Sequence, residues 1–247
     1  MESDDIRSGN AKFIVIEGID GSGSTTQGQD LTNYFRGLGK PAIFTREPSI
    51  GPIGYMIRMA LTGRLKGKRE NGTANGAGAD EDLHMATELD PLVMALLFAA
   101  DRRDHIAVEV APNLARGRTV FCDRYLMSTL AYQGLHTDLD WLLAINEKAI
   151  QPDLTIFLDI NADVARQRIQ GTRWTEDIYE GIETQSRVRE MYHHVIDMGL
   201  PILGPVVRVD SSLPKQVVQA KMRQIVSHFL ETGIMMTEHQ PNLGLFG

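Results

Sequence analysis

A glycine-rich stretch near the start of the chain has the residue types of a phosphate-binding loop. Residues 12–27, KFIVIEGIDGSGSTTQ, place three glycines between a short apolar run and a Thr-Thr pair. Backbone N–H groups of such a loop, beside the positive end of the following helix, can cradle an anion. Gly18, Gly23 and Thr25 fit the pattern G-x-x-x-x-G-K-[ST], but Ser24 occupies the lysine position. Taken alone, the loop is equally compatible with a Ser/Gly turn before an ordinary helix.

The phosphate-loop hypothesis assigns roles to the loop residues and to one metal ion. A threonine at the last position of the pattern can ligate Mg²⁺ through its hydroxyl, so Thr25 is expected to bind magnesium together with Asp123. The residues expected to surround the ATP phosphates are Gly18, Gly21, Ser22, Gly23, Ser24, Thr25 and Thr26.

Arginines recur near the ends of expected strands and on helices that could flank a cleft. Their guanidinium groups bind phosphate oxygens with two parallel hydrogen bonds. The commoner role of any single arginine is a solvated helix face or an ion pair, so the hypothesis depends on the whole set. The set comprises Arg58, Arg102, Arg124, Arg166, Arg168 and Arg173.

Two further stretches combine aromatic and polar residues, and the first of them could hold a flat base. In LLFAADRRDH, Phe98 precedes Arg102 by four residues, so both lie on one face of a helix, with a core phenylalanine and a rim arginine as the alternative. In CDRYLMSTLAYQG, an expected strand end is followed by a helix start, where Ser128 could equally be an N-cap. The other polar candidates of this stretch are Asp123, Arg124, Thr129, Tyr132 and Gln133.

The elements that position these residues are apolar strands alternating with helices. Such strands predict a mostly parallel sheet with helices on both faces, and ligands bind outside the carboxyl ends of its strands. Asp20, Glu47 and the pair Asp123-Arg124 lie just past expected strand ends. Residues 90–117 are expected to be helical with a break near Pro112, and residues 128–150 to be helical throughout. The expected strands lie within residues 13–16, 41–48, 119–125, 154–160 and 206–210.

Composition bounds the class of protein. The chain has 247 residues, 43% of them hydrophobic, and a formal net charge of −7 with a sequence pI of about 5.5. The acidic balance argues against a general nucleic-acid binder. No apolar run is long enough to span a membrane, and the acidic start is unlike a signal peptide. The single cysteine, Cys122, favours a reducing cytoplasm.

We expect one domain with less ordered segments around it. The Gly-, Asn- and Ala-rich residues 63–82 are interpreted as a flexible insertion, and residues 171–181 as a polar connection, while the resemblance described next implies a lid region at residues 166–182. The full division is a disordered tail at 1–11, a single domain at 12–231 and a C-terminal tail at 232–247.

Together these stretches resemble the thymidylate kinase family, a group of P-loop nucleoside monophosphate kinases. The resemblance covers about residues 12–230, in family order. It implies an α/β fold with a five-stranded parallel sheet, helices on both faces and a small lid, usually in a homodimer. The matching motifs are FIVIEGIDGSG.TTQ, TREP at Thr45–Pro48, LLFAADR at Leu96–Arg102, DRY…S.LAYQG at Asp123–Gly134, PDLTIFLD at Pro152–Asp159 and RVRE.Y at Arg187–Tyr192.

The resemblance also implies the reaction and the role of each residue. The family moves the γ-phosphoryl of ATP, with Mg²⁺, onto dTMP to give dTDP, and it binds neither nucleic acid nor membrane. By this resemblance Asp20, Arg124 and Arg173 are catalytic, and Arg166 and Arg168 join the ATP-phosphate residues. The residues implied to bind dTMP are Glu47, Pro48, Arg58, Phe98, Arg102, Arg124, Ser128, Thr129, Tyr132 and Gln133.

Within that set the resemblance implies distinct tasks. Phe98 would stack on thymine and Arg102 would bond its edge, while Thr129 and Gln133 would read the base. Tyr132 would lie under the deoxyribose. In a second group, Arg58 and Arg124 would hold the dTMP phosphate, with Asp20 and Glu47 near the sugar and the acceptor phosphate.

The chain departs from the family pattern at several positions. Ser24 replaces the lysine, Ser49-Ile50 replaces a Gly-Gly pair, and Asp177-Ile178 replaces the Asp-Arg pair of the lid. We expect a lid-region arginine, first Arg173, to supply the missing charge. Two alternatives stay open: a weak or inactive relative that senses dTMP or dTTP, and a kinase for another deoxypyrimidine monophosphate.

Overall fold

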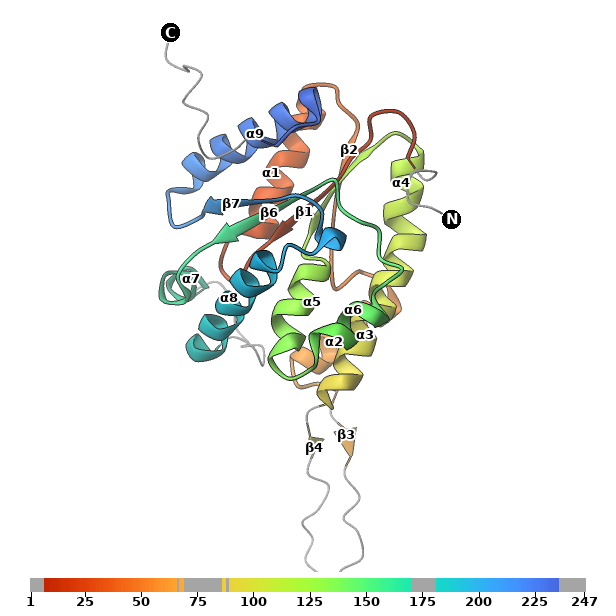
Figure 1. Cartoon of the computed structure of the whole chain (residues 1–247), viewed down its shortest axis with the longest axis vertical. Helices are drawn as coiled ribbons and strands as arrows, with labels where there is room; N and C mark the ends of the chain where they lie inside the picture. The colour runs from red at the N-terminus through yellow and green to blue at the C-terminus, as the bar shows by residue number, and fades with distance from the viewer. Residues whose placement is uncertain (1–6, 66, 69–85, 88, 170–180, 236–247) are drawn as a thin grey trace, which may run out of the picture.

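Five parallel strands form the main sheet of the computed structural model, which describes residues 7–65, 67, 68, 86, 87, 89–169 and 181–235 (Figure 1). All four neighbouring pairs are parallel, in the order β2-β5-β1-β6-β7. The five-stranded parallel sheet predicted from the sequence is therefore confirmed. The strands are β1 (Phe13–Glu17), β2 (Ala42–Arg46), β5 (Thr119–Asp123), β6 (Leu154–Asp159) and β7 (Val206–Asp210).

The apolar central strand is buried on both faces because its side chains alternate. Phe13 and Val15 belong to the hydrophobic core on one face of the sheet. Ile14 and Ile16 belong to the core on the other face. All four side chains are at most 1% exposed. Full burial of each such side chain is worth about 1.5–3 kcal/mol, so β1 holds the two helical layers to one sheet.

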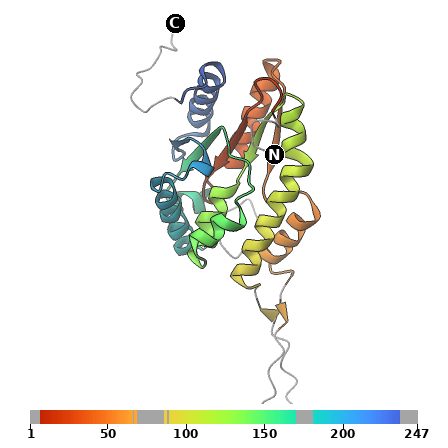
Figure 2. The same cartoon turned by 45° about the vertical axis from the view of Figure 1, so that its right-hand side comes forward.

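Helices cover both faces, as predicted, and Figures 1 and 2 show the layers. On one face α1 (Ser24–Gly37) and α9 (Lys215–Thr232) pack beside each other. The remaining layer includes α5 (Leu126–Tyr132) and α8 (Ile182–Asp197) on the opposite face, where Val188 and Leu130 join the core. The other helices are α2 (Pro52–Leu61), α3 (Pro91–His105), α4 (Ala111–Ala115), α6 (Leu139–Ile145) and α7 (Ala162–Ile169).

The break expected near Pro112 is a wide helical turn rather than an interruption. Residues Ile106–Val110 form a π-helical turn between α3 and α4. The N–H of Ala111 donates to the carbonyl of Ile106, five residues back. Proline lacks an N–H and its ring would strike the carbonyl four residues earlier in a regular α-helix, so the wider turn accommodates Pro112.

The helix expected over residues 128–150 is wrong in its continuity. The chain forms α5, a 3₁₀ turn at Gln133–Leu135 and then α6. The side chain of Asp138 accepts a 2.9 Å hydrogen bond from the N–H of Trp141 and so starts α6 anew. An N-cap of this kind competes with continuing the preceding helix.

The expected end segments and insertion fall partly outside the described ranges. Residues 7–11 differ from the tail predicted over 1–11, because they pack on the fold. Arg7 donates to Asp153 at 2.7 Å, and Ala11 is buried. A short antiparallel pair, β3 (Gly67–Lys68) with β4 (Ala86–Thr87), projects beyond α2 and α3 (Figures 1 and 2). Residues 69–85 of the insertion and its flank, 170–180 of the lid and 236–247 of the tail lie outside the described residues. In the described part of the chain, no helix is long and apolar enough to cross a membrane.

Candidate active site

Two cavities meet at the carboxyl edge of the sheet. A cavity of about 230 Å³ is lined by the ends of β2 and β5 together with α2, α3 and α5. A cavity of about 750 Å³ lies over the glycine-rich loop and the start of α9. We call them the acceptor cavity and the loop cavity. The residues that line both are Asp20, Thr25, Arg46 and Arg124.

The loop between β1 and α1 has the backbone of an anion cradle. Gly21 and Gly23 adopt φ values of 81° and 93°, which a residue with a side chain rarely tolerates. A Cβ on Gly21 would also lie 2.4 Å from the carbonyl oxygen of Ala165. The chain then turns into α1, whose first residues, Ser24 and Thr25, line the loop cavity. Backbone N–H groups at this helix start therefore face the cavity.

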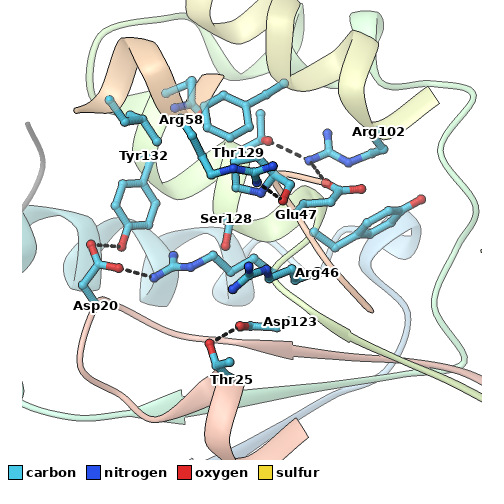
Figure 3. A pocket seen from close by; sticks show the side chains of 16 residues that line it. Asp20, Thr25, Arg46, Glu47, Arg58, Arg102, Asp123, Ser128, Thr129 and Tyr132 are labelled. Carbon is cyan, nitrogen blue, oxygen red and sulfur yellow. Dashed lines mark hydrogen bonds and ion pairs between the residues drawn. The ribbon is translucent and has the colours of Figure 1, made fainter. Parts of the chain in front are cut away.

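Thr25 and Asp123 fit the site of a magnesium ion. The hydroxyl of Thr25 donates to one carboxylate oxygen of Asp123, as the dashed line in Figure 3 marks. The other oxygen, Oδ1, is buried and has no hydrogen-bond partner among the described residues. Within the same residues no cluster of three His, Cys, Asp or Glu side chains forms a protein-only metal site. Magnesium bound through one or two side chains plus substrate phosphates matches this sparse donor set.

The end of the acceptor cavity at Arg102 is held by a buried charge pair. Arg102 is 1% exposed, and its Nη2 lies 2.8 Å from both Glu47 Oε2 and Thr129 Oγ1 (Figure 3). A further hydrogen bond runs from Nη1 to Asn146. Its Nε is buried and unpaired within the described structure, as is Gln133 Nε2 in the same cavity wall. Two side chains at this end of the cavity therefore each have a buried donor without an acceptor among the described residues.

A buried histidine supports that pair from behind. His105 Nδ1 lies 3.2 Å from Glu47 Oε1, and its Nε2 lies 2.7 Å from the hydroxyl of Thr45. Glu109 approaches the same Nε2 at 3.5 Å. Burial alone lowers the pKa of His105, but the hydrogen bonds and charges of Glu109 and Glu47 outweigh it and raise the pKa from 6.5 to about 9. At neutral pH His105 is therefore a cation that holds Glu47 in place.

The helix that carries the expected base-reading residues is capped from a distant strand. Glu17, at the end of β1, accepts hydrogen bonds from the backbone N–H groups of Tyr125 and Ser128 at 2.9 and 3.2 Å. Its other oxygen accepts from the hydroxyls of Ser128 and Tyr192. Burial raises the pKa of Glu17, while these hydrogen bonds act in the opposite direction. Glu17 thus ties α5 to the strand that leads into the glycine-rich loop.

A second charge pair lies where the two cavities join. Arg124 Nη2 donates to Asp20 Oδ1 at 2.6 Å, and the guanidinium lies 5.1 Å from the ring centre of Tyr132. Gln185 donates to the other oxygen of Asp20 at 2.9 Å. Arg124 has a φ of 67°, the one positive value at a described non-glycine residue. Such backbone strain persists where surrounding structure fixes a side chain for a task.

The structure brings most of the expected site residues together. All ten residues expected to bind dTMP line the acceptor cavity, and so do Asp20 and Asp123. The glycine-rich loop lines the other cavity from Gly21 to Thr26. Gly18 lines neither cavity. A Cβ there would lie 2.9 Å from the Leu158 carbonyl, so this glycine serves close packing of the loop.

Some expected roles differ in detail. Glu47 lines the acceptor cavity and uses both oxygens on Arg102 and His105. Arg58 donates to the carbonyls of Pro48 and Ser49, at 2.8 and 2.5 Å. These bonds fix its guanidinium at the cavity wall.

The lid-region arginines separate into three cases. Arg166 lines neither cavity, because residues two apart on a helix do not share a face with Arg168. Arg168 lines the loop cavity but donates to the carbonyls of Ser212 and Leu213, at 3.2 and 3.5 Å. Arg173 lies outside the described residues.

Sequence reasoning missed several residues of the site. Arg46 was overlooked although it stands inside the TREP motif, next to Glu47. Glu17 could have been noticed as a charged residue at the end of an apolar run. His105 could have been noticed as a polar residue one helical turn beyond Arg102. Their partners lie far away in sequence, so only the fold identifies them. The other missed residues of the cavity walls are Ile19, Gln27, Leu61, Tyr125, Ile169, Ser211–Pro214, Lys215 and Val218.

Comparison with known proteins decides the family. The family described as thymidylate kinase matches residues 16–222. The chain belongs to the thymidylate kinase family. It is 38% identical over 187 residues to a probable thymidylate kinase of Thermococcus gammatolerans, covering 75% of this chain and 83% of that protein. It is also 33% identical over 225 residues to a thymidylate kinase of Nostoc sp. PCC 7120, covering 89% of this chain and 97% of that protein.

Membership of this family makes the chain an ATP:dTMP phosphotransferase. Its glycine-rich loop lines the larger cavity, which meets the second cavity at Asp20, Thr25, Arg46 and Arg124.

Proposed function

We propose that the chain transfers the γ-phosphoryl of ATP to dTMP, giving dTDP and ADP. The observation that carries the acceptor assignment is the pair of unpartnered buried donors, Arg102 Nε and Gln133 Nε2, in a cavity of about 230 Å³. Leaving such donors unpaired costs about 1–3 kcal/mol each, so a ligand with matching acceptors gains selectivity there. Thymine offers two ring carbonyls and an apolar methyl to the same wall.

The apolar part of the wall suits a pyrimidine ring. Phe98 and Leu61 line the acceptor cavity beside Arg102. An aromatic face adds stacking to the hydrogen bonds of the base edge. On the sugar side Tyr132 is 7% exposed and bears on the Arg124 guanidinium, which supports a tight fit under a deoxyribose. A 2′-hydroxyl would bring a further polar group against this ring.

The acceptor phosphate is proposed to bind at the cationic end of the cavity. Arg58 and Arg124 line this end, and Figure 3 shows Arg46 nearby, between Glu47 and the Thr25–Asp123 pair. Two guanidinium groups around one space favour a dianion. Asp20 holds Arg124 by a 2.6 Å hydrogen bond, so the fork is oriented before the substrate enters.

On the donor side, the loop is proposed to hold the ATP phosphates through its backbone N–H groups. Gly21 to Thr26 line the loop cavity, and Thr25 with Asp123 would hold Mg²⁺. When bound, Mg²⁺ would neutralise charge on the phosphate oxygens. The chain's own residues position the two nucleotides so that the transferred phosphoryl crosses beside Arg46 and Arg124.

Turnover in a coupled assay tests the proposal. Purified protein with ATP and Mg²⁺ should phosphorylate dTMP with the highest kcat/KM among dTMP, dUMP, dCMP and UMP. Gln133→Leu keeps the size of the side chain but removes its donor. It should raise the KM for dTMP by about 10-fold or more, the scale of one buried hydrogen bond to a neutral base. Thermal stabilisation by dTMP without any product would instead indicate a nucleotide sensor. Preference for dCMP or dUMP would assign another deoxypyrimidine.

We also infer that the protein is a cytoplasmic homodimer. The support for association is a set of exposed apolar side chains on the paired helices α2 and α3, which we call the apolar strip: Tyr55, Met59, Leu92 and Leu96 are 42–61% exposed. The two residues on each helix lie one turn apart, and exposed apolar surface mediates protein interactions. Cys122, the single cysteine of the chain, supports a reducing compartment, and cell fractionation would test it.

A further inference from the structure

The glycine-rich loop of this chain carries no cation of its own. Ser24 stands at the lysine position of the pattern and is the first residue of α1, 7% exposed. A lysine there reaches the β- and γ-phosphates of the donor, whereas the short hydroxyl of serine cannot. Phosphoryl transfer depends on neutralising charge that spreads over the transferred group. Under the proposed function, another side chain must therefore reach the point of transfer.

Four described cationic side chains line the loop cavity. Two of them are held by hydrogen bonds within the protein, and a third does not reach the acceptor cavity. Arg124 is held by Asp20, and Arg168 by two backbone carbonyls of the loop after β7. Lys215, at the first turn of α9, lines the loop cavity alone and does not reach the acceptor cavity. The remaining cation is Arg46.

Arg46 lies where the transferred group must pass. It is the last residue of β2, directly opposite Asp123 in the sheet register. It lines both cavities, and Figure 3 shows it next to the Thr25–Asp123 pair. Its side chain is exposed and has no hydrogen bond or ion pair to any other described residue. Its guanidinium is therefore available to a ligand.

Arg58 is a second cationic side chain close to Arg46, and both would be stabilised by a bound anion. Burial, followed by the charge of Arg46, lowers the pKa of Arg58. Two guanidinium groups that repel each other across a cavity are relieved by a phosphate between them. Arg58 itself is fixed on the carbonyls of Pro48 and Ser49, which leaves Arg46 as the group that can follow the phosphoryl.

We propose that Arg46 supplies the positive charge that Ser24 cannot, as a catalytic residue that contacts the γ-phosphoryl during transfer. In the reaction the bond between the γ-phosphorus and the oxygen bridging it to the β-phosphorus breaks, and that oxygen keeps the electron pair. A phosphate oxygen of dTMP forms the new bond. Arg46 neutralises the charge on the γ-phosphoryl oxygens between these two positions. The inference rests on the proposed function, and its tests separate the two.

The first test is kinetic. Arg46→Ala should lower kcat by at least about 100-fold, the scale expected for one charge-stabilising donor, with little change in the KM for dTMP. Arg116→Ala, which removes an exposed arginine far from both cavities, is the matched control and should leave kcat unchanged. Arg46→Gln keeps a polar side chain and should lower kcat in the same way. Equal melting temperatures of both variants and the native protein would show that the loss of activity is not a folding defect. A raised KM with unchanged kcat would overturn the assignment, since Arg46 would then only bind the acceptor.

The second test is a double-mutant cycle with the loop. Ser24→Lys should raise the kcat of the Arg46→Ala variant by about 10-fold or more while changing the native enzyme far less. The same cycle with Arg173→Ala is the comparison. If the effects of Ser24→Lys and Arg46→Ala on kcat are additive, residues 24 and 46 do not share a task, and the proposal is refuted. Coupling with Arg173 alone assigns the charge to the lid region instead.

The third test needs no turnover. Fluoroaluminate with MgADP and dTMP imitates the transferred phosphoryl, and calorimetry measures the binding of the set. The native protein should bind it far more tightly than Arg46→Ala does, while both bind MgADP alone equally. Equal binding of the full set by both proteins refutes the role of Arg46. Absence of dTDP formation by the native protein, with this difference in binding retained, would refute the proposed function and leave the Arg46 contact standing.

Discussion

Individual charges in the site work in pairs that the fold assembles from distant positions. Arg124 is paired with Asp20, and Arg102 is paired with Glu47, which His105 holds from the other side. All four side chains line the acceptor cavity, and the carboxylate of each pair fixes the direction of its arginine. A substitution in either pair therefore changes the position of a charge as well as its presence.

Arg124→Ala should lower kcat/KM for dTMP by about 100-fold or more. Removing one partner of a desolvated charge pair costs about 2–5 kcal/mol, and the remaining carboxylate of Asp20 would repel the acceptor phosphate. Steady-state kinetics against Arg116→Ala measures the effect. An unchanged kcat/KM would mean that Arg124 has no contact with the acceptor.

His105 should make the stability of the fold depend on pH between neutrality and mild alkali. Its pKa is 6.5 when unfolded and about 9 when folded, so the stabilisation is complete below about pH 6.5 and is lost as pH rises through about 9. The difference corresponds to on the order of 3 kcal/mol. Urea unfolding should show this loss in the native protein. Its charged neighbours are Glu47, Glu109 and, through Glu47, Arg102.

The control for that experiment removes the titrating group. His105→Gln keeps a polar side chain and should flatten the decline across the window from about pH 6.5 to 9. His194→Gln changes an exposed histidine of α8 and should leave the decline as it is. A decline of equal size in the His105→Gln protein would assign the pH dependence to other groups.

Residue types and spacing indicate a base-binding wall at Phe98 and Arg102, whereas only the family resemblance implies that Tyr132 and Gln133 face the acceptor. All four line the acceptor cavity. His105 and Glu17 could not be found in that way. Their roles depend on partners 58 and 111 residues away, at Glu47 and Ser128, which only the folded chain brings near.

Among the elements, strands were easier to predict than the interruptions of helices. The central strands β1, β5 and β6 are short apolar runs buried on both faces, and that pattern has few alternatives in a parallel sheet. Helix continuity depends on single contacts instead. Asp138 restarts a helix by capping it, and the π turn before Pro112 continues one that the sequence suggests should break.

The cap on α5 gives a prediction at this scale. Glu17→Ala should destabilise the fold, because each buried N–H of Tyr125 and Ser128 left without an acceptor costs about 1–3 kcal/mol. It should also raise the KM for dTMP, since α5 carries Thr129 and Tyr132. Urea unfolding and steady-state kinetics measure the two effects.

Glu17→Gln is the matched comparison. Its amide oxygen can still accept from both backbone N–H groups, and its amide nitrogen can donate to the hydroxyls of Ser128 and Tyr192, which act as either donor or acceptor. The glutamine variant should therefore keep most of the stability. Equal losses in both variants would show that the charge of Glu17, rather than its hydrogen-bonding shape, holds α5.

At the scale of the whole molecule, the apolar strip on α2 and α3 predicts the state of association. Leu96→Glu should convert a dimer to a monomer, because Leu96 is 49% exposed and a carboxylate cannot be buried there without a partner. Light scattering coupled to size exclusion measures the mass. Val217→Glu on α9, at 48% exposure on the opposite layer, should leave the mass unchanged. A native protein with the mass of one chain would contradict the inferred dimer.

The π turn at Ile106–Val110 means that α3 and α4 differ in phase by one residue from a regular helix. Arg102 and His105 therefore face the site while Leu114, further along, still faces the core. A π-helical turn accommodates one additional residue without rotating the helical segments on either side of it. A lineage of this family that lacked one residue here would have to rotate either the active-site half or the core half of the helix by about 100°, one residue's share of a helical turn. Length at this position should thus vary less freely among relatives than sequence does.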